Sequence, residues 1–272
     1  MRTPRIFVDP PLAAHQALRL EAPASRHLLT VLRLKPGAAL ILFDGAGHEF
    51  DARLEAIEGK PIRALVGTAR ANGNESPLHI TLAQAISRGE RMDYTVQKAV
   101  ELSVAEIIPL LTARSVVRLD AEQAARKCEH WQQLTIHACE QSGRACVPKM
   151  QTPVTPTELL AARPRSELRL LLDPAAGSAL DAVRTPPESI LLLVGPEGGL
   201  DEAELEQATA AGFQSLRLGP RVRHTETAAL VALSVLQARW GDLAAAERVP
   251  LEDCSRRRTR LMGGAPLRQR FE

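Results

Sequence analysis

Short apolar runs separated by turn residues fill the first 71 residues of the chain. The runs read IFV, ALILFDG, EFDARLEAI and PIRALVG, and the turn segments Lys35–Gly37 and Asp44–Gly47 interrupt them. Runs of this length between turn residues are typical of β-strands. We therefore predict a small β-barrel, interrupted by one short helix from about Ser25 to Arg33.

The pattern changes after a polar segment, Arg70–Pro77, which carries turn residues and lacks periodicity. Beyond it, the apolar runs HITLAQAI, EIIPLL, LRLLLD, SILLLVG and FQSLRLG alternate with longer helical stretches. Such alternation predicts an α/β domain with a mostly parallel sheet. We place the boundary near residue 73, so that the predicted domains span residues 1–72 and 73–243.

Helices of the second domain carry recognisable start and stop signals. Thr155–Glu158 and Asp201–Glu204 each place an N-cap oxygen three residues before a glutamate that can reach back, which predicts two capping boxes. Gly212 stands where the second of these helices should end. The last helix is predicted over Thr225–Trp240.

The last segment, residues 244–272, carries three consecutive arginines, Arg256–Arg258, and no apolar periodicity. We interpret it as a basic, poorly ordered tail. Its arginines would add nonspecific contacts to RNA phosphates, or the tail is a solvated extension without a role.

Composition narrows the class of protein without identifying it. With 45% hydrophobic and 24% charged residues, the chain is that of a globular protein with a proper core. No apolar window approaches the length of a membrane span, and we expect a cytoplasmic protein without membrane contact. A net charge of +2 is too small to establish a nucleic-acid partner.

The cysteines give no sign of a metal site. Cys128, Cys139, Cys146 and Cys254 form no C-x-x-C pair and no cysteine/histidine cluster with zinc spacing. We expect reduced thiols and no metal.

Two glycine-bearing strand ends hold the most informative chemistry. In the first, the apolar run that ends at Val194 leads into Gly195–Gly199, GPEGG, and a capped helix follows at once. Glycine at such a turn lets a ligand approach backbone amides at the edge of a parallel sheet. It is not the dinucleotide fingerprint G-x-G-x-x-G, because proline and glutamate occupy the loop.

The second strand end lies one β-α unit later. There the sequence LRLGPRVRHTETA, Leu216–Ala228, places a basic loop before a helix that opens with Thr225. Each loop taken alone is compatible with a well-capped helix and nothing more. Two such strand ends in neighbouring units, one acidic and one basic, favour a shared ligand pocket.

These loops, in this order and at this separation, resemble the cofactor loops of the ribosomal RNA uridine-N3 methyltransferase family called RsmE, a branch of the SPOUT methyltransferases. The resemblance covers residues 1 to about 243. It includes PRIFV, HLLTVLRLKPGAALILFDG, SPLHITLAQAISRGERMDYTVQKAVELSV and HACEQSGRACVP.

The resemblance implies both a fold and a reaction. The fold is a PUA-like β-barrel that binds RNA, followed by an α/β SPOUT domain whose C-terminal chain forms a trefoil knot. The reaction is methylation of uridine N3 in 16S ribosomal RNA of the small ribosomal subunit, with S-adenosyl-L-methionine as methyl donor. The active site is expected at the interface of a homodimer.

The resemblance also places the cofactor against three strand ends. The residues implied are Leu172, Asp173, Leu193, Val194, Gly195, Glu197, Gly198, Gly199, Leu216, Leu218, Gly219, Val222, His224, Thr225, Glu226 and Thr227.

Candidate catalytic residues follow from the chemistry of the reaction. A cation stabilises a uridine anion, and the candidates are Arg114, Arg221 and Arg223. A carboxylate serves as base, and the candidates are Glu197 and Glu226, either of which could instead orient the cofactor.

Candidate RNA contacts are spread over both predicted domains. They are Arg5, His27, Arg33, Lys35, Arg88, Arg91, Glu140, Gln141 and Arg144. Any one of them taken singly could be a solvated surface charge.

The chain departs from the family pattern in two places. Arg223 and His224 stand where leucine and arginine usually precede TETA. Either Arg223 supplies that charge from the neighbouring position, or His224 replaces the arginine less well and in a pH-dependent way. Ser103 replaces the usual glycine of the ELGV stretch.

Three other functions remain open from the sequence. The chain could methylate another RNA site, or it could bind RNA without modifying it. A nucleotide-dependent oxidoreductase is the third alternative, and the missing dinucleotide fingerprint disfavours it.

Overall fold

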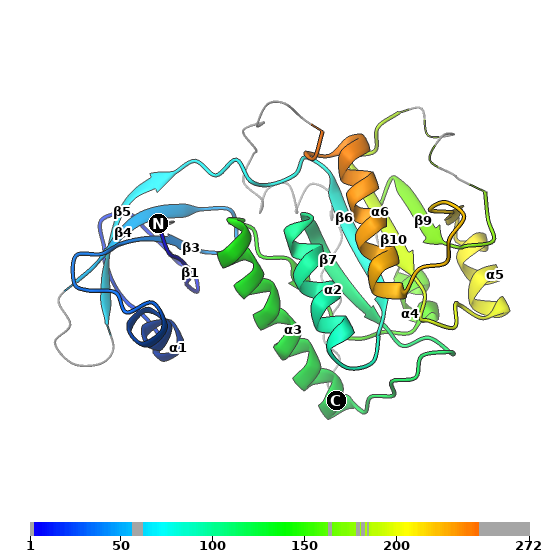
Figure 1. Cartoon of the computed structure of the whole chain (residues 1–272), viewed down its shortest axis with the longest axis horizontal. Helices are drawn as coiled ribbons and strands as arrows, with labels where there is room; N and C mark the ends of the chain where they lie inside the picture. The colour runs from blue at the N-terminus through cyan, green and yellow to red at the C-terminus, as the bar shows by residue number, and fades with distance from the viewer. Residues whose placement is uncertain are drawn as a thin grey trace. The chain divides into compact units, whose positions relative to one another are not determined.

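The computed structural model describes residues 3–55, 62–162, 165–177, 180, 183 and 185–244. It divides into two compact units, which we describe separately (Figure 1). The first contains the described residues up to Glu75 together with Cys139–Val147, and the second contains Ser76–Ala138 and the described residues from Pro148 onward. Except for residue 244, the predicted basic tail lies outside the described residues.

The first unit is built on a curled five-stranded sheet in the order β1-β3-β4-β5-β2 (Figure 1). Its strands are β1 (Arg5–Phe7), β2 (Ala17–Arg19), β3 (Ala39–Phe43), β4 (Glu49–Leu54) and β5 (Arg63–Arg70). Strand β1 pairs with β3 in parallel, and the other pairs are antiparallel. The four apolar runs of the sequence therefore form strands as predicted, whereas β2 was not predicted.

Alternation along the strands gives the first unit its core. Along β4 the buried Phe50, Ala52 and Leu54 alternate with the exposed Asp51 and Arg53, because successive side chains of a strand point to opposite faces. The predicted helix is present as α1 (Ala22–Arg26) and the π-helical turn η1 (His27–Val31).

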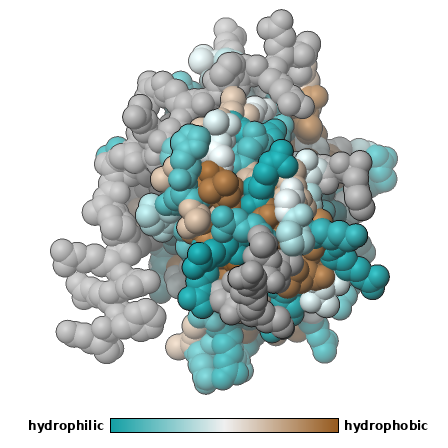
Figure 2. Space-filling model, turned by 90° about the vertical axis from the view of Figure 1, so that its left-hand side faces the viewer, coloured by the Kyte–Doolittle hydropathy of each residue, from teal (hydrophilic) through white to brown (hydrophobic). Residues whose placement is uncertain are grey.

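Polar and apolar side chains mix on the surface of this unit. Among the coloured residues, Figure 2 shows teal side chains with brown patches between them. The large hydrophobic side chains exposed in this unit are Val31, Leu32 and Leu65.

The second unit is built on a six-stranded sheet in the order β11-β9-β10-β6-β7-β8. Its strands are β6 (His79–Ala85), β7 (Val104–Leu110), β8 (Lys149–Met150), β9 (Leu168–Leu172), β10 (Ser189–Val194) and β11 (Gln214–Leu216). All five pairings between these strands are parallel. The predicted parallel α/β sheet is confirmed, and the short β8 is an addition.

Helices cover this sheet. They are α2 (Glu90–Glu101), α3 (Ala121–Ser142), α4 (Pro156–Ala162), α5 (Glu202–Ala210) and α6 (Thr225–Trp240). Helices α2 and α6 pack against each other in front of β6, β7 and β10 (Figure 1). Every residue of β10 is buried, as expected for a central parallel strand that is covered on both faces.

The predicted helix signals agree with the structure. Asp201 caps α5 in a capping box with Glu204, and Gly212 lies beyond its end with a φ of 83°. Thr155 and Glu158 exchange the equivalent hydrogen bonds before α4. Helix α6 has the predicted bounds. No helix within the described ranges is long and apolar enough to span a membrane.

Candidate functional site

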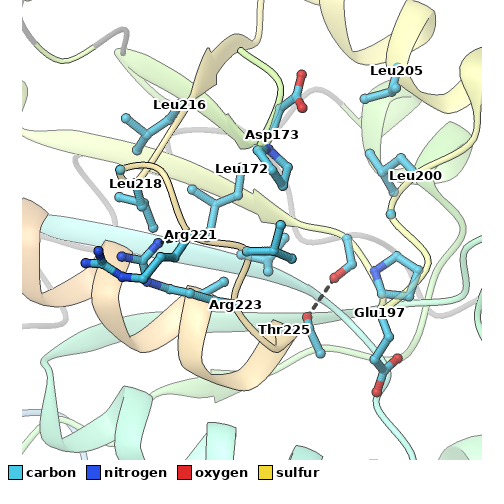
Figure 3. A pocket seen from close by; sticks show the side chains of 18 residues that line it. Leu172, Asp173, Glu197, Leu200, Leu205, Leu216, Leu218, Arg221, Arg223 and Thr225 are labelled. Atoms are coloured by element: carbon cyan, nitrogen blue, oxygen red, sulfur yellow. Dashed lines mark hydrogen bonds between the residues drawn. The ribbon is translucent and has the colours of Figure 1, made fainter. Parts of the chain in front are cut away.

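A pocket opens at the carboxyl ends of β9, β10 and β11, which lie side by side in the sheet (Figure 3). Carboxyl ends of neighbouring parallel strands meet at one edge, so the loops that follow them enclose common space. The pocket, its open mouth included, holds about 900 Å³ of empty space. The acidic and basic loops thus share one pocket, as their sequences indicated.

Most of the predicted cofactor residues lie in the pocket wall. Those that line it are Leu172, Asp173, Val194, Gly195, Glu197, Gly199, Leu216, Leu218, Gly219, Val222 and Thr225. Five others do not: Leu193, Gly198, His224, Glu226 and Thr227. Leu193 instead belongs to the hydrophobic core behind the pocket, and Thr227 is exposed on α6.

Sequence reasoning missed four wall residues: Pro174, Leu200, Leu205 and Ala228. Pro174 and Leu200 adjoin predicted positions in the same loops and could have been included on that ground. Leu205 and Ala228 lie inside α5 and α6, where apolar residues are expected to face a core.

Glycine backbone conformations shape both loops. Gly199 has a φ of 69° and Gly219 a φ of 81°, in the left-handed region that side-chain-bearing residues rarely adopt. A Cβ atom on Gly199 would meet nothing within 4 Å, so the requirement for glycine there is conformational.

Hydrogen bonds through Thr225 connect the acidic loop, the start of α6 and strand β6. The hydroxyl of the buried Thr225 donates to the carbonyl of Gly195 at 2.7 Å (Figure 3). The same oxygen accepts from Nε2 of the fully buried Gln84 at 2.9 Å. Thr225 therefore holds the two loops of the pocket in register.

The basic loop places two arginines at the pocket. Figure 3 shows the side chains of Arg221 and Arg223 next to each other near Leu218. Nη1 of Arg223 donates to the carbonyl of Arg221 at 3.1 Å. His224 precedes α6 without a side-chain capping bond and does not line the pocket. Of the two residues that depart from the family pattern before TETA, Arg223 lies in the wall and His224 does not.

The acidic loop is held by arginines from two other segments. Nη1 of Arg91 lies 3.2 Å from Oε1 of Glu197, and its Nε lies 4.0 Å from Oε1 of Glu226. Nη1 of Arg114 donates to the carbonyl of Gly198 at 2.9 Å. Arg91 was predicted to contact RNA and Arg114 to act in catalysis. In the structure, both side chains bind the acidic loop.

The wall suits a ligand with one apolar and one polar part. Leu172, Leu216 and Leu218 give it an apolar side, and Glu197 with the two arginines gives it charged groups (Figure 3). Such a combination of apolar surface and few polar groups is usual in small-molecule sites. The leucine side suits an adenosine and the acidic loop around Glu197 suits an amino acid, so the residues present are compatible with S-adenosylmethionine.

Some predicted RNA contacts are exposed and others are not. Arg33, Lys35, Arg88 and Gln141 are exposed, whereas the side chain of His27 lies outside the described residues. Oε1 of Glu140 accepts from the backbone N–H of Phe7 at 3.1 Å.

Arg5 and Arg144 are buried in ion pairs of the first unit. Arg5 pairs with Glu49 at 2.6 Å, and Arg144 pairs with Glu75 at 2.9 Å. All four side chains are at most 9% exposed. Arg5 also donates to the carbonyl of Arg144 at 3.0 Å. A guanidinium group that is buried and paired in this way stabilises the fold, and we do not retain Arg5 and Arg144 as RNA contacts.

The cysteines follow the expectation only in part. Cys128 and Cys139 are free, and burial raises the pKa of the Cys139 thiol to about 12. Cys146 is disulfide-bonded, so the expectation of reduced thiols is wrong for this residue. No cluster of three or more His, Cys, Asp or Glu residues in the described ranges could hold a metal ion, and the absence of a metal stays a prediction.

Two protein families match the chain in the order of its units. Residues 20–66 match an RNA methyltransferase PUA domain, and residues 74–237 match an RNA methyltransferase domain. Among curated relatives, the ribosomal RNA small subunit methyltransferase E of Buchnera aphidicola is 30% identical over 241 residues, which cover 89% of this chain and 95% of the relative. The enzyme of the same name from Mycobacterium tuberculosis is 32% identical over 223 residues, which cover 79% and 84%.

Two solved structures with bound cofactor are similar to this chain over most of its length. One is a methyltransferase from Legionella pneumophila in complex with S-adenosylmethionine, with a TM-score of 0.84 and 42% identity. The other is a ribosomal RNA small subunit methyltransferase E from Neisseria gonorrhoeae bound to S-adenosylmethionine, with a TM-score of 0.82 and 40% identity. Each covers 89% of this chain and 100% of the solved chain.

Proposed function

This chain belongs to the RNA methyltransferase family, in the group of the ribosomal RNA small subunit methyltransferases E, and from this premise we propose the atom that it methylates. We propose that this atom is N3 of a uridine. The chain is an S-adenosylmethionine-dependent methyltransferase of 16S ribosomal RNA. The observation that carries the finer proposal is the pocket that GPEGG and LGPRV-x-x-TETA jointly line, since these are the loops on which the resemblance to the uridine-N3 enzymes rests.

S-adenosylmethionine, when bound, supplies the methyl group from its sulfonium. We assign its apolar part to Leu172, Leu216 and Leu218, and its polar part to the acidic loop around Glu197. The hydrogen bond from Thr225 to Gly195 keeps these two sides of the wall together. Alignment of two bound substrates can by itself lower a reaction barrier by several kcal/mol, so wall geometry is a direct contribution to the rate.

Methylation of uridine N3 requires loss of the N3 proton, which free uridine releases only well above neutral pH. The new N–CH₃ bond forms at N3 while the sulfonium C–S bond breaks, and the proton passes to a base. Arg221 and Arg223 are the cations of the wall that would stabilise the uridine anion. Glu197 and Glu226 are the carboxylates near the acidic loop that would accept the proton.

The first unit supplies the RNA-binding surface in this proposal. Its match to a PUA domain supports this role. On it, Arg33 and Lys35 expose cations that would contact phosphates, and Arg88 does so on the second unit. Low aromatic content, 3%, disfavours a base-stacking platform, so shape and phosphate contacts would dominate.

Further features of the proposal follow the family. We propose a homodimer whose partner completes the active site, a trefoil knot in the C-terminal part of residues 73–243, and a PUA-like domain over residues 1–72. Two-fold pairing is also the most common soluble assembly. Because its substrate is ribosomal RNA, we propose that the protein acts in the cytoplasm. We also propose that it needs no metal.

A methylation assay tests the proposal. The purified protein is incubated with S-adenosylmethionine and small ribosomal subunits from a strain that lacks this activity, and the RNA is mapped by mass spectrometry. We expect one new methyl group on N3 of a uridine in 16S RNA. Methylation at another atom or in another RNA would contradict the assignment to N3, and RNA binding without methyl transfer would identify a non-catalytic RNA-binding protein.

A further inference from the structure

Arg91 contacts carboxylates from two separate segments of the pocket. It stands in the first turn of α2, and its guanidinium approaches Glu197 in the acidic loop and Glu226 in the first turn of α6. The two distances use different nitrogens, Nη1 at 3.2 Å to Glu197 and Nε at 4.0 Å to Glu226. A planar guanidinium with several fixed donors can serve two carboxylates at once, which an ammonium cannot do in the same way.

Glu226 is held by only one of its carboxylate oxygens. Oε1 faces Arg91, whereas Oε2 is buried and has no hydrogen-bond partner among the described residues. A buried acceptor without a partner is uncommon and needs an explanation, of which an absent ligand is one. The side chain is 17% exposed, so it is close to the surface of the site without lying free in water. Among the described residues, Arg91 is the cation that faces this carboxylate.

The backbone of Arg91 lies in a helix that is packed against a neighbouring helix. Helix α2 packs against α6, and the carbonyl of Arg91 accepts from the hydroxyl of Thr95 at 2.9 Å. The guanidinium is thus presented from a helix that already contacts the helix carrying Glu226. Arg114 binds the next residue of the acidic loop, Gly198, through a backbone carbonyl. The loop is therefore attached at two successive positions by two arginines.

We propose that Arg91 is a positioning residue of the methyl-transfer site, which fixes the acidic loop against the start of α6 by joining Glu197 and Glu226. This inference rests on the proposed function, because it assigns Arg91 a role in the same site. Through Glu197, a wall residue, Arg91 sets the shape of the cofactor pocket. Through Glu226, it directs the unpaired oxygen.

A direct RNA contact by Arg91 is the competing role. The side chain is 50% exposed, so a phosphate could reach it. However, Glu197 and Glu226 both face the guanidinium, and they offset the charge on which a phosphate contact depends. The two roles differ in a measurable way, because only a positioning residue affects cofactor binding in the absence of RNA.

The experiment is a calorimetric measurement of S-adenosylmethionine binding to the full chain without RNA. We expect Arg91→Gln to weaken the affinity by about threefold to thirtyfold, which is the usual range for residues that couple parts of a site. Arg91→Lys should restore part of the loss, since an ammonium can still reach one carboxylate. The matched control is Lys98→Gln, which removes an exposed ion pair with Glu101 on the same helix and should leave the affinity unchanged.

A double-mutant cycle with Glu197→Gln tests the route of the effect. If Arg91 acts through Glu197, Arg91→Gln causes a smaller loss of cofactor affinity in the Glu197→Gln background than in the wild type. Additive losses in the cycle would contradict this route. Because the Arg91–Glu197 pair is partly exposed, its loss should not unfold the protein, and circular dichroism checks this. If Arg91→Gln is unstable, Arg91→Lys tests the same contact with an ammonium group in place of the guanidinium.

RNA binding provides the opposing outcome. If Arg91→Gln leaves cofactor affinity unchanged, raises KM for ribosomal subunits and reduces the salt dependence of RNA binding, Arg91 is a phosphate contact and the proposal is wrong. These measurements do not depend on which RNA atom is methylated. A failure of the N3 assignment would therefore appear in the mass spectra of the wild type, separately from the outcome for Arg91.

Discussion

The hydroxyl of Thr225 donates to the backbone carbonyl of Gly195 at 2.7 Å, which joins the first residue of α6 to the residue that follows β10. Thr225 is 4% exposed, and its oxygen also accepts from Gln84. Two loops that lie 30 residues apart in sequence thereby form one wall. The stability of the pocket thus depends on a side chain that the sequence marks as a helix start and as a candidate cofactor residue, but not as a link between the two loops.

Replacement of Thr225 by valine should weaken both the fold and the site. The change leaves the Gly195 carbonyl without the Thr225 donor and removes one of the two acceptors of the buried Gln84 amide, so we expect a loss of about 1–3 kcal/mol in the free energy of unfolding. Cofactor affinity should fall as well, because the two loops lose their connection. Urea denaturation and calorimetry measure the two effects. Thr225→Ser, which keeps the hydroxyl, should lose less in both, and equal losses would mean that the methyl group matters more than the hydrogen bond.

Alanine substitutions should separate the two adjacent glycines of the acidic loop. Gly199→Ala forces a φ of 69° on a residue with a side chain, which costs about 1–2 kcal/mol or displaces the loop. A Cβ on Gly198 would lie 3.6 Å from Arg114, an ordinary contact. We expect Gly199→Ala to lose cofactor affinity and Gly198→Ala to keep most of it, both in folded protein. Calorimetry with S-adenosylmethionine decides, and the reverse order would place the cofactor against Gly198.

The capping box before α4 predicts a pH dependence. Two hydrogen bonds lower the pKa of Glu158 below the ordinary value of 4.5. The larger effect comes from the backbone N–H of Thr155, at 2.7 Å, and the smaller from the hydroxyl of the same residue. A carboxyl whose pKa is lower in the folded state contributes stability above its unfolded pKa and loses it as pH falls through the folded value. Glu158→Gln should therefore lower Tm at pH 7 and have a smaller effect below about pH 4. Melting curves at the two pH values measure this, and an equal Tm difference at both would exclude the carboxylate as the cause.

Loss of a buried arginine in the first unit should destabilise the protein strongly. Arg144→Met leaves Glu75 buried without its partner, and a broken buried pair costs about 3–5 kcal/mol. The matched control is Arg126→Met, because the Arg126–Glu122 pair is about three-quarters exposed and should change stability by less than about 1 kcal/mol. Urea denaturation compares the two. If Arg144→Met is as stable as the control and instead weakens RNA binding, the buried ion pair is not its main role.

Long apolar runs made most of the fold predictable, and short or long-range features did not. The strands β6, β7 and β10 each contain six or seven residues that are nearly all buried. Their sequences are therefore long apolar runs that identify them as strands. Strand β2 has three residues and no buried one, and β8 has two residues, so neither leaves a pattern to recognise. Their pairing is decided by neighbouring strands rather than by their own sequence.

The assignment of residues 139–147 to the first unit was not predictable from local pattern. It depends on partners far away in sequence, such as Glu75 for Arg144 and Arg144 for Arg5. In sequence, a buried paired arginine and an exposed arginine look the same. For that reason two of the predicted RNA contacts proved to be buried.

The candidate site was predictable where glycines and charges mark strand ends. Both loops were identified, and most predicted cofactor positions line the pocket. The cross-links between the loops were not identified, because Gln84 and Thr225 lie 141 residues apart and neither has an unusual neighbour in sequence. The exchange at Arg223 and His224 was noted, and the structure places Arg223 rather than His224 in the wall.

Arg223 provides the sharpest test of the chemistry, because its charge should matter only when uridine loses its proton. Arg223→Gln removes a cation from the wall, and we expect kcat at pH 7 to fall by about 10- to 100-fold while cofactor affinity changes little. As pH rises, uridine ionises more readily without help, so the rate of the variant should approach that of the wild type. Arg223→Lys, which keeps a cation, should recover much of the activity. Single-turnover rates with small ribosomal subunits between pH 6 and 9 measure the profile. A variant whose rate is reduced by the same factor at every pH would show that Arg223 positions the RNA and does not stabilise the anion.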